Sequence, residues 1–256
     1  WQSRDRWAGG GPGQRLRRWS TARVVPLALF LLRGHKERHR RFVERAAERI
    51  SPELRAAPSW SSREVLKDPR FYLILPVMLA PSYISTGFFF HMAHLVESKG
   101  WSLTDFTEAY FLYVVVISGV SLLTGSLVDR VGAVMLLPYY LIPQGVSMLA
   151  IASSEHPGAA LIYMLASGAT VGLRVTIGGA IWAEIYGVAH LGGIRALATS
   201  FMVLATALAP VTMGWWIDRG VTMESIALGC IVFVVLSSLL AWFAFRFGDE
   251  RAPSGR

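Results

Sequence analysis

The stretch Ala159–Ile185 reads AALIYMLASGATVGLRVTIGGAIWAEI and contains only two charged residues, Arg174 and Glu184. An α-helix needs about 20 consecutive, mostly apolar residues to cross a hydrocarbon core roughly 30 Å thick. This stretch is long and apolar enough, so it predicts a transmembrane helix with one arginine close to its middle.

Five more stretches have the same length and hydrophobicity, so the sequence predicts an all-α, polytopic membrane protein with six transmembrane helices. The short loops between the stretches are typical of a packed bundle. The other five predicted spans are Phe71–Val96, Thr104–Val128, Ala133–Ala152, Gly192–Ile217 and Ser225–Phe247.

The composition supports this class and shows an uneven distribution of charge. Of the 256 residues, 53% are hydrophobic and 16% are charged, against roughly 25% charged residues in soluble domains. Residues 1–70 hold 17 of the 25 Lys and Arg and 7 of the 17 Asp and Glu, a net charge of +10. Because this basic stretch directly precedes a membrane segment, we expect it to contact anionic lipid head groups and not nucleic acid.

The sequence divides into four regions. Residues 1–32 are expected to be disordered, or the remnant of a truncated preceding helix, because the apolar run 24–32 is too short to span. Residues 33–70 are predicted as a basic cytoplasmic linker, 71–247 as the six-helix domain and 248–256 as a cytoplasmic tail. Lys and Arg gather in the loops of one side, which predicts a cell-membrane protein with both termini in the cytoplasm.

One short motif occurs twice. The run Gly125–Gly132 reads GSLVDRVG, and the run Gly214–Gly220 reads GWWIDRG. Each lies at the end of the second helix of a three-helix unit, and the two lie on opposite sides of the membrane. This placement predicts two inverted three-helix repeats, as in many secondary transporters.

The first copy of the motif is the candidate for a cytoplasmic gate, although a solvated turn explains the same residues. Asp and Arg at a helix end can form ion pairs in one conformation and lose them in another. Glu184 ends the fourth span on the same side, where it could pair with Arg195 or Arg130. The predicted gating residues are Gly125, Asp129, Arg130, Gly132, Glu184 and Arg195.

These motifs, with Trp182–Gly187 (WAEIYG), His190–Arg195 (HLGGIR) and Ala209–Gly214 (APVTMG), resemble the carboxyl-terminal half of a major facilitator superfamily transporter. The resemblance covers about Trp60 to Phe247, and the overall pattern is similar to the monocarboxylate and oxalate–formate branch. It implies a missing amino-terminal six-helix half as a partner. It also implies a small-molecule solute as substrate, with an organic anion and a coupled proton left open.

Arg174 is the strongest candidate for a substrate-binding residue. A charge at the bilayer centre costs roughly 2.5–3.5 kcal/mol on insertion scales, so its side chain is expected to face the bundle interior or water. Polar or small residues at spacings of three and four share its helix face. The predicted face comprises Tyr163, Ser167, Thr170, Arg174 and Gly178. The alternative is a structural arginine bonded to carbonyl groups of a broken neighbouring helix.

The first span offers a second face, with Tyr83, Gly87, His91 and His94. Tyr83 and His91 are counted as substrate-binding candidates. Histidine titrates near neutral pH, so His91 and His94 could relay protons, whereas the alternative is that they anchor the helix at the interface. No third ligand is evident in the sequence, so no metal site is predicted.

The leading functional prediction is a secondary carrier that moves a small solute by alternating access, with this chain supplying one half. The alternative is a non-transporting or inactive, truncated six-helix membrane protein. The sequence contains no H-E-x-x-H, no G-x-S-x-G and no G-x-x-x-x-G-K-[ST] motif. These absences argue against an enzyme and an ATP-driven pump, and no cofactor is predicted.

Overall fold

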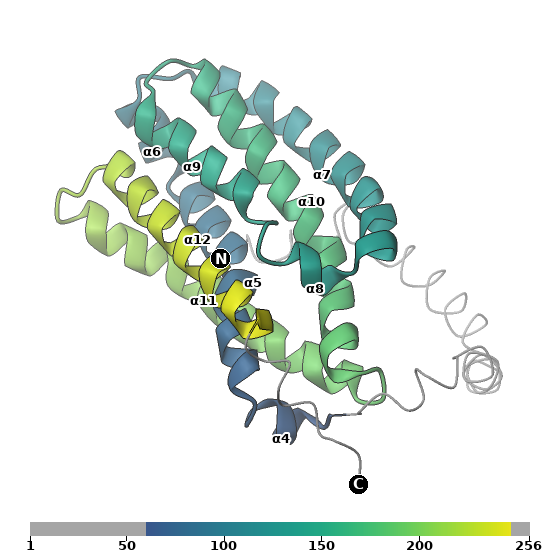
Figure 1. The fold of residues 1–256 in the computed structure, drawn as a ribbon. Helices are drawn as coiled ribbons and strands as arrows, with labels where there is room; N and C mark the ends of the chain where they lie inside the picture. Colours follow the sequence, from purple (N-terminus) through teal and green to yellow (C-terminus); the bar gives the residue numbers. More distant parts are fainter. Residues whose placement is uncertain (1–59, 247–256) are drawn as a thin grey trace, which may run out of the picture. The chain divides into compact units, whose positions relative to one another are not determined.

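The computed structural model describes residues 60–246, and every regular element in this range is an α-helix. The regions predicted for residues 1–59 and 247–256, including most of the basic linker and the tail, lie outside the described residues. The helices are α4 (Ser62–Val65), α5 (Pro69–Phe90), α6 (Met92–Ser98), α7 (Leu103–Val131), α8 (Ala133–Leu136), α9 (Ile142–Ser153), α10 (Gly158–Tyr186), α11 (Leu191–Ile217) and α12 (Met223–Arg246). Figure 1 shows their arrangement.

Five of these helices are long and apolar enough to cross a membrane, namely α5, α7 from Ala109 onward, α10, α11 and α12. The large apolar side chains on their outer faces are strongly exposed: Leu122 is 79% exposed, Leu123 74% and Phe90 71%. Soluble monomers rarely expose contiguous apolar surface of this kind, whereas the acyl chains of a bilayer cover it. The fold is therefore that of an all-helical, membrane-type bundle.

The predicted span Ala133–Ala152 is not one continuous helix. The structure contains the four-residue helix α8, a turn over residues 137–141 and the 12-residue helix α9, which by itself is too short to span. Pro138 and Pro143 lie at this break, and proline lacks the N–H that an uninterrupted helix would use. The described residues therefore contain five helices long enough to span a membrane, where six spans were predicted.

The predicted span Phe71–Val96 is also divided. Helix α5 starts where the Asp68 carboxylate accepts a hydrogen bond from the Arg70 N–H and Pro69 occupies the first turn, a common helix start. It ends at His91, whose φ and ψ of −97° and 21° are not helical, and α6 follows directly. The membrane-crossing part of this span is therefore α5.

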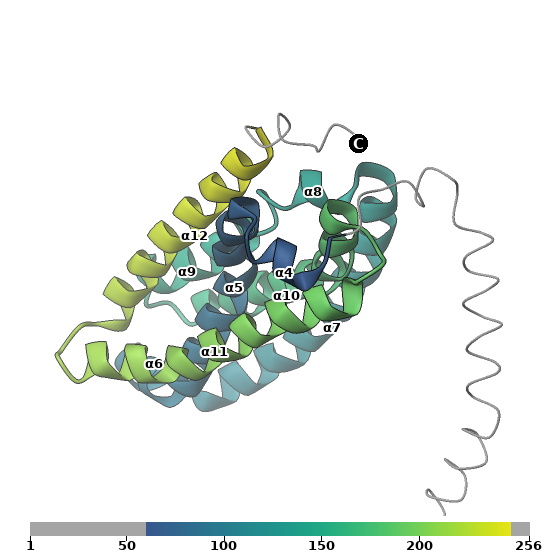
Figure 2. The same cartoon turned by 90° about the horizontal axis from the view of Figure 1, so that it is seen from below.

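The helices pack in a limited set of pairs. α7 lies along α10, and α11 lies along α5. α9 packs against α10 and α12, and α12 packs in turn against α5, which Figure 2 shows between α11 and α12. The core of the described bundle therefore lies between α5, α9, α10 and α12, while much of α7 and α11 faces outward.

Two opposite ends of the bundle can be defined by their contacts. At the α8 end, Trp60 next to α4 packs on Tyr186 at the end of α10, with 5.7 Å between ring centroids. At the α6 end, the Trp101 Nε1–H donates to the carbonyl oxygen of Glu155 in the α9–α10 loop, at 2.6 Å. The residues predicted to form the site lie at and between these two ends.

Candidate functional site

Arg174 lies near the middle of α10, 16 residues after Gly158 and 12 before Tyr186. Its Nη1–H points at the Sδ atom of Met202 on α11, 3.1 Å away, and its Nε atom is buried without a hydrogen-bond partner. A thioether sulfur is only a weak acceptor. The positive charge of Arg174 is thus poorly compensated by the described part of the chain.

A hollow of about 690 Å³ opens beside Arg174 between α5, α7, α10 and α11. We call it the Arg174 hollow. Hydroxyl groups from three of these helices accompany the guanidinium, and the Oγ atom of Ser85 is buried without a partner. The polar residues that line the hollow with Arg174 are Ser82, Ser85, Thr86, Tyr113 and Thr206.

A second cavity, of about 260 Å³, lies between α5, α10 and α11 and also contains Arg174. We call it the two-arginine cavity, because Arg195 lines it as well. Arg195 donates from Nη2 to the backbone carbonyl of Gly179 on α10. Arg174 therefore lines both the Arg174 hollow and the two-arginine cavity, and Arg195 lines only the two-arginine cavity.

The rest of the predicted face on α10 lies elsewhere. Tyr163 and Ser167 are each 1% exposed and Thr170 is fully buried, and none of the three lines a cavity described above. Tyr163 packs among the aromatic rings of Phe88 and Phe106, and Thr170 donates to the carbonyl of Ala166. The structure thus brings Gly178 and Arg174 to one cavity and leaves the other three in the helix packing.

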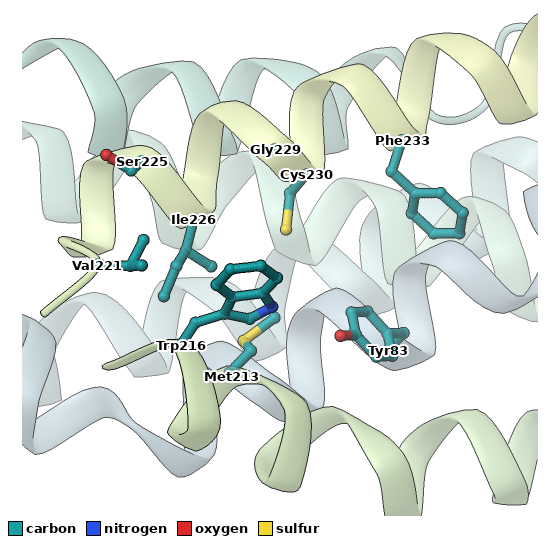
Figure 3. A pocket seen from close by; sticks show the side chains of 9 residues that line it. All are labelled: Tyr83, Met213, Trp216, Val221, Ser225, Ile226, Gly229, Cys230 and Phe233. Carbon is teal, nitrogen blue, oxygen red and sulfur yellow. The ribbon is translucent and has the colours of Figure 1, made fainter. Parts of the chain in front are cut away.

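Tyr83 belongs to a different cavity, of about 530 Å³, between α5, α11 and α12 (Figure 3). Its hydroxyl lies 2.5 Å from that of Thr212, and its ring packs on Phe233. Most other lining side chains are apolar, including Met213 and Trp216, and none carries a charge. The structure therefore does not bring Tyr83 to the cavities that Arg174 lines.

The stripe on α5 that faces Arg174 is offset by one residue from the predicted stripe. Ser82, Ser85 and Thr86 line the Arg174 hollow, whereas Tyr83 and Gly87 face α11 and α12. The sequence contains a signal for this face, because residues at spacings of three and four share one side of a helix. Tyr113, Met202 and Thr206 were also missed, because they lie on other helices and no spacing relates them to Arg174.

The two histidines lie at the α6 end. The His91 ring Nδ1 is 3.0 Å from the Gly87 carbonyl oxygen, and its Nε2 lies close to Gly214 of α11. His94 is exposed. No group of three or more potential metal ligands occurs among the described residues. His91 thus contacts the junction of α5 and α11, away from Arg174.

The predicted gate residues occupy the α8 end, with an arrangement that the sequence did not suggest. The Glu184 carboxylate accepts hydrogen bonds from the backbone N–H groups of Ala133 and Val134, at 2.8 and 3.0 Å. A carboxylate is well placed at the start of a helix, where N–H groups lack partners. Glu184 therefore holds the start of α8 and pairs with neither Arg130 nor Arg195.

Within the motif itself, Gly132 has φ +87° and forms the turn between α7 and α8, a conformation that favours glycine. Asp129 and Arg130 are exposed and form no ion pair within residues 60–246. A Cβ atom on Gly125 would meet nothing within 4 Å, so close helix approach does not account for this glycine.

At the α6 end, the Lys99 ammonium and the Glu224 carboxylate form an ion pair at 2.7 Å. The Lys99 side chain is 2% exposed and the Glu224 side chain 34%. It is the one ion pair among the side chains that the structure describes, and it joins the end of α6 to the start of α12.

No protein-family model and no curated protein matches this chain. The resemblance to the major facilitator superfamily therefore stays a prediction from the motifs.

Proposed function

We propose that the chain is part of a secondary carrier of the major facilitator type, which moves a small solute across the cell membrane by alternating access. In this proposal the chain supplies one six-helix half, and the segment from α8 to α9 is an interrupted sixth crossing. As one unbroken helix, residues 133–153 would be about 30 Å long at 1.5 Å per residue, the thickness of a hydrocarbon core; the turn between α8 and α9 interrupts this helix.

The observation that carries the proposal is the guanidinium of Arg174. It lies mid-way along an apolar helix, next to an open hollow with hydroxyl groups, and has no acidic partner among the described residues. Ionisable residues within membrane helices usually face a cavity and mark a substrate or ion pathway. A structural role would instead satisfy the buried Nε atom within the protein.

The helix packing supports the inverted repeat. Let α5, α7 and α8–α9 form one unit and α10, α11 and α12 the other. When each helix is replaced by the helix at the same position in the other unit, every major contact becomes another observed contact or itself. The α7–α10 contact becomes α11–α5, the α9–α10 contact becomes α12–α5, and α9–α12 maps onto itself. A pseudo-two-fold axis in the membrane plane relates inverted repeats in this way.

The charged contacts at the two ends follow the same exchange. Glu184, at the end of the first helix of one unit, binds the start of α8, the first part of the third helix in the other unit. Lys99, just after the first span of its unit, binds Glu224 at the start of α12, the third helix of the other. Each contact ties together the two units at one side of the membrane.

The experiment that tests the proposal is a solute-uptake screen on vesicles that contain the product of the whole gene, with an imposed pH gradient. The proposal expects saturable accumulation of at least one small solute above vesicles from cells with an empty vector. If the protein inserts in the membrane and no solute in a broad panel accumulates, the non-transporting alternative holds.

A further inference from the structure

We propose that Arg174 and Arg195 together form a binding site for a dianionic solute in the two-arginine cavity. The inference rests on the proposed function, because it names the substrate class of the same site. It adds Arg195 to the binding residues, a residue whose expected role was in a gate. The cavity is lined by α5, α10 and α11, and each arginine comes from a different helix.

The lining of the two-arginine cavity is positively charged. Both cations line it, and no Asp or Glu is among the described residues that do. Glu184 is the nearest acidic residue to Arg174 along α10, and its carboxylate is already bound to the backbone of α8. Two like charges that share a partly enclosed space repel each other, so a bound anion would relieve this repulsion.

The guanidinium groups of Arg174 and Arg195 both have hydrogen-bond donors to spare. A guanidinium carries five N–H donors in a fixed fork. Arg174 uses one on a weak sulfur acceptor and has its Nε buried and unpaired. Arg195 uses one on the Gly179 carbonyl and is otherwise exposed. Several donors of both groups are therefore available to an oxyanion, and arginine binds carboxylate and phosphate with two parallel bonds.

The spacing of the two arginine positions along α10 bears on the size of the ligand. Arg195 contacts α10 at Gly179, five residues after Arg174, which corresponds to about 7.5 Å along the helix axis. Gly178 and Gly179 lack side chains between the two positions, and a Cβ at Gly178 would approach Met78 within 3.2 Å. A small dicarboxylate carries its two charges on separate groups that can each meet one guanidinium, whereas a phosphate group requires both side chains to converge on it. We infer a ligand with two negative charges rather than one.

The test is calorimetric titration of the purified full chain in detergent at pH 8, with succinate, phosphate and acetate as probes. Succinate carries two charges on two groups, phosphate two charges on one group, and acetate a single charge. We expect at least one dianion to bind at least tenfold more tightly than acetate. Tighter binding of succinate would mean that the two charges of the ligand lie on two groups, and tighter binding of phosphate that they lie on one.

The variants Arg174→Gln and Arg195→Gln are each expected to bind the dianion at least tenfold more weakly than the unchanged protein does. In each variant the dianion should then bind almost as weakly as acetate. Arg246→Gln is the matched control, because Arg246 is exposed at the α8 end and stacks on Trp242, 4.8 Å from the ring centroid. The proposal is overturned if Arg195→Gln binds the dianion as tightly as the unchanged protein does. It is also overturned if the unchanged protein binds acetate as tightly as it binds both dianions. Because Arg195 is exposed, its variant tests the proposal even if Arg174→Gln fails to fold.

The titration does not depend on transport, so the two proposals can fail separately. Dianion binding without uptake of any solute contradicts the carrier and supports the site. Uptake of a solute without dianion binding supports the carrier and contradicts the two-arginine site.

Discussion

Arg174 and Glu184 lie ten residues apart on α10, and their charges are compensated in different ways. Glu184 receives three backbone hydrogen bonds at the start of α8, whereas Arg174 has a sulfur atom and an unpaired Nε. Charges with good protein partners stabilise a fold, and charges without them are available to ligands. This contrast shows a structural contact for Glu184, and it is the reason why we propose a binding role for Arg174.

Glu184→Ala should lower stability, because the N–H groups of Ala133 and Val134 then lose their acceptor. The expected loss is about 1 kcal/mol, the usual effect of removing a helix cap, and the measurement is thermal unfolding in detergent. Glu97→Ala is the control, since Glu97 is exposed on α6. Equal melting temperatures for the two variants would contradict the assigned contact.

At the residue scale, Arg174 and Glu184 stand out because a charge in an apolar run is visible without a structure, but the partner predicted for Glu184 was wrong. The sequence did not identify the stripe of α5 that faces Arg174. Both stripes of α5 contain hydroxyl groups at helical spacing, so periodicity alone does not tell which one faces the hollow. That choice depends on where α7 and α11 pack, which is a tertiary property.

At the element scale, hydropathy located five spans and missed the break in the sixth. The stretch Ala133–Ala152 is apolar throughout, and hydropathy does not register that Pro138 lacks an N–H. Gly132 and Gly187 both have positive φ at helix ends, a conformation that favours glycine.

The pair Gly168 and Gly172 provides an element-scale prediction. A Cβ at Gly172 would lie 2.8 Å from the Ile117 carbonyl oxygen and 3.1 Å from the Ser121 nitrogen of α7, so Gly172→Ala must move α7 away from α10. Overpacking of this kind costs about 1–3 kcal/mol. The melting temperature in detergent should fall.

Gly119→Ala on α7 is the matched control, because a Cβ there would meet nothing within 4 Å. Alanine also has a higher helix propensity than glycine, by about 0.8–1.0 kcal/mol, so this variant should be neutral or slightly stabilising. A Gly172→Ala variant as stable as Gly119→Ala would show that α7 and α10 are not in backbone contact.

At the scale of the whole molecule, the distribution of charge between the two ends predicts an orientation of the bundle in the membrane. Arg130 and Arg246 lie at the α8 end with Arg63, and the α6 end contains Lys99 and Arg219. Arg219 stacks on Trp215, 3.6 Å from its ring centroid, and Arg246 stacks on Trp242. Trp with a flanking cation is typical of a membrane interface, and the more basic end is expected in the cytoplasm.

Cysteine labelling tests this orientation. In a Cys230→Ala background, which removes the single cysteine, Glu155→Cys at the α6 end should react with a membrane-impermeant maleimide in intact cells. Arg130→Cys should react only after permeabilisation. The reverse pattern would place the α8 end outside and contradict the proposed topology.

We expect Arg174 to bind the transported solute, and uptake by the Arg174→Ala variant of the whole gene product is the direct test. The measurement is initial uptake in vesicles of a solute found in the screen, normalised to the amount of protein in the membrane, with Arg219→Ala as the control. We expect uptake by Arg174→Ala to fall at least a hundredfold with normal insertion, and uptake by Arg219→Ala to stay unchanged. Unchanged uptake kinetics in Arg174→Ala would contradict this expectation.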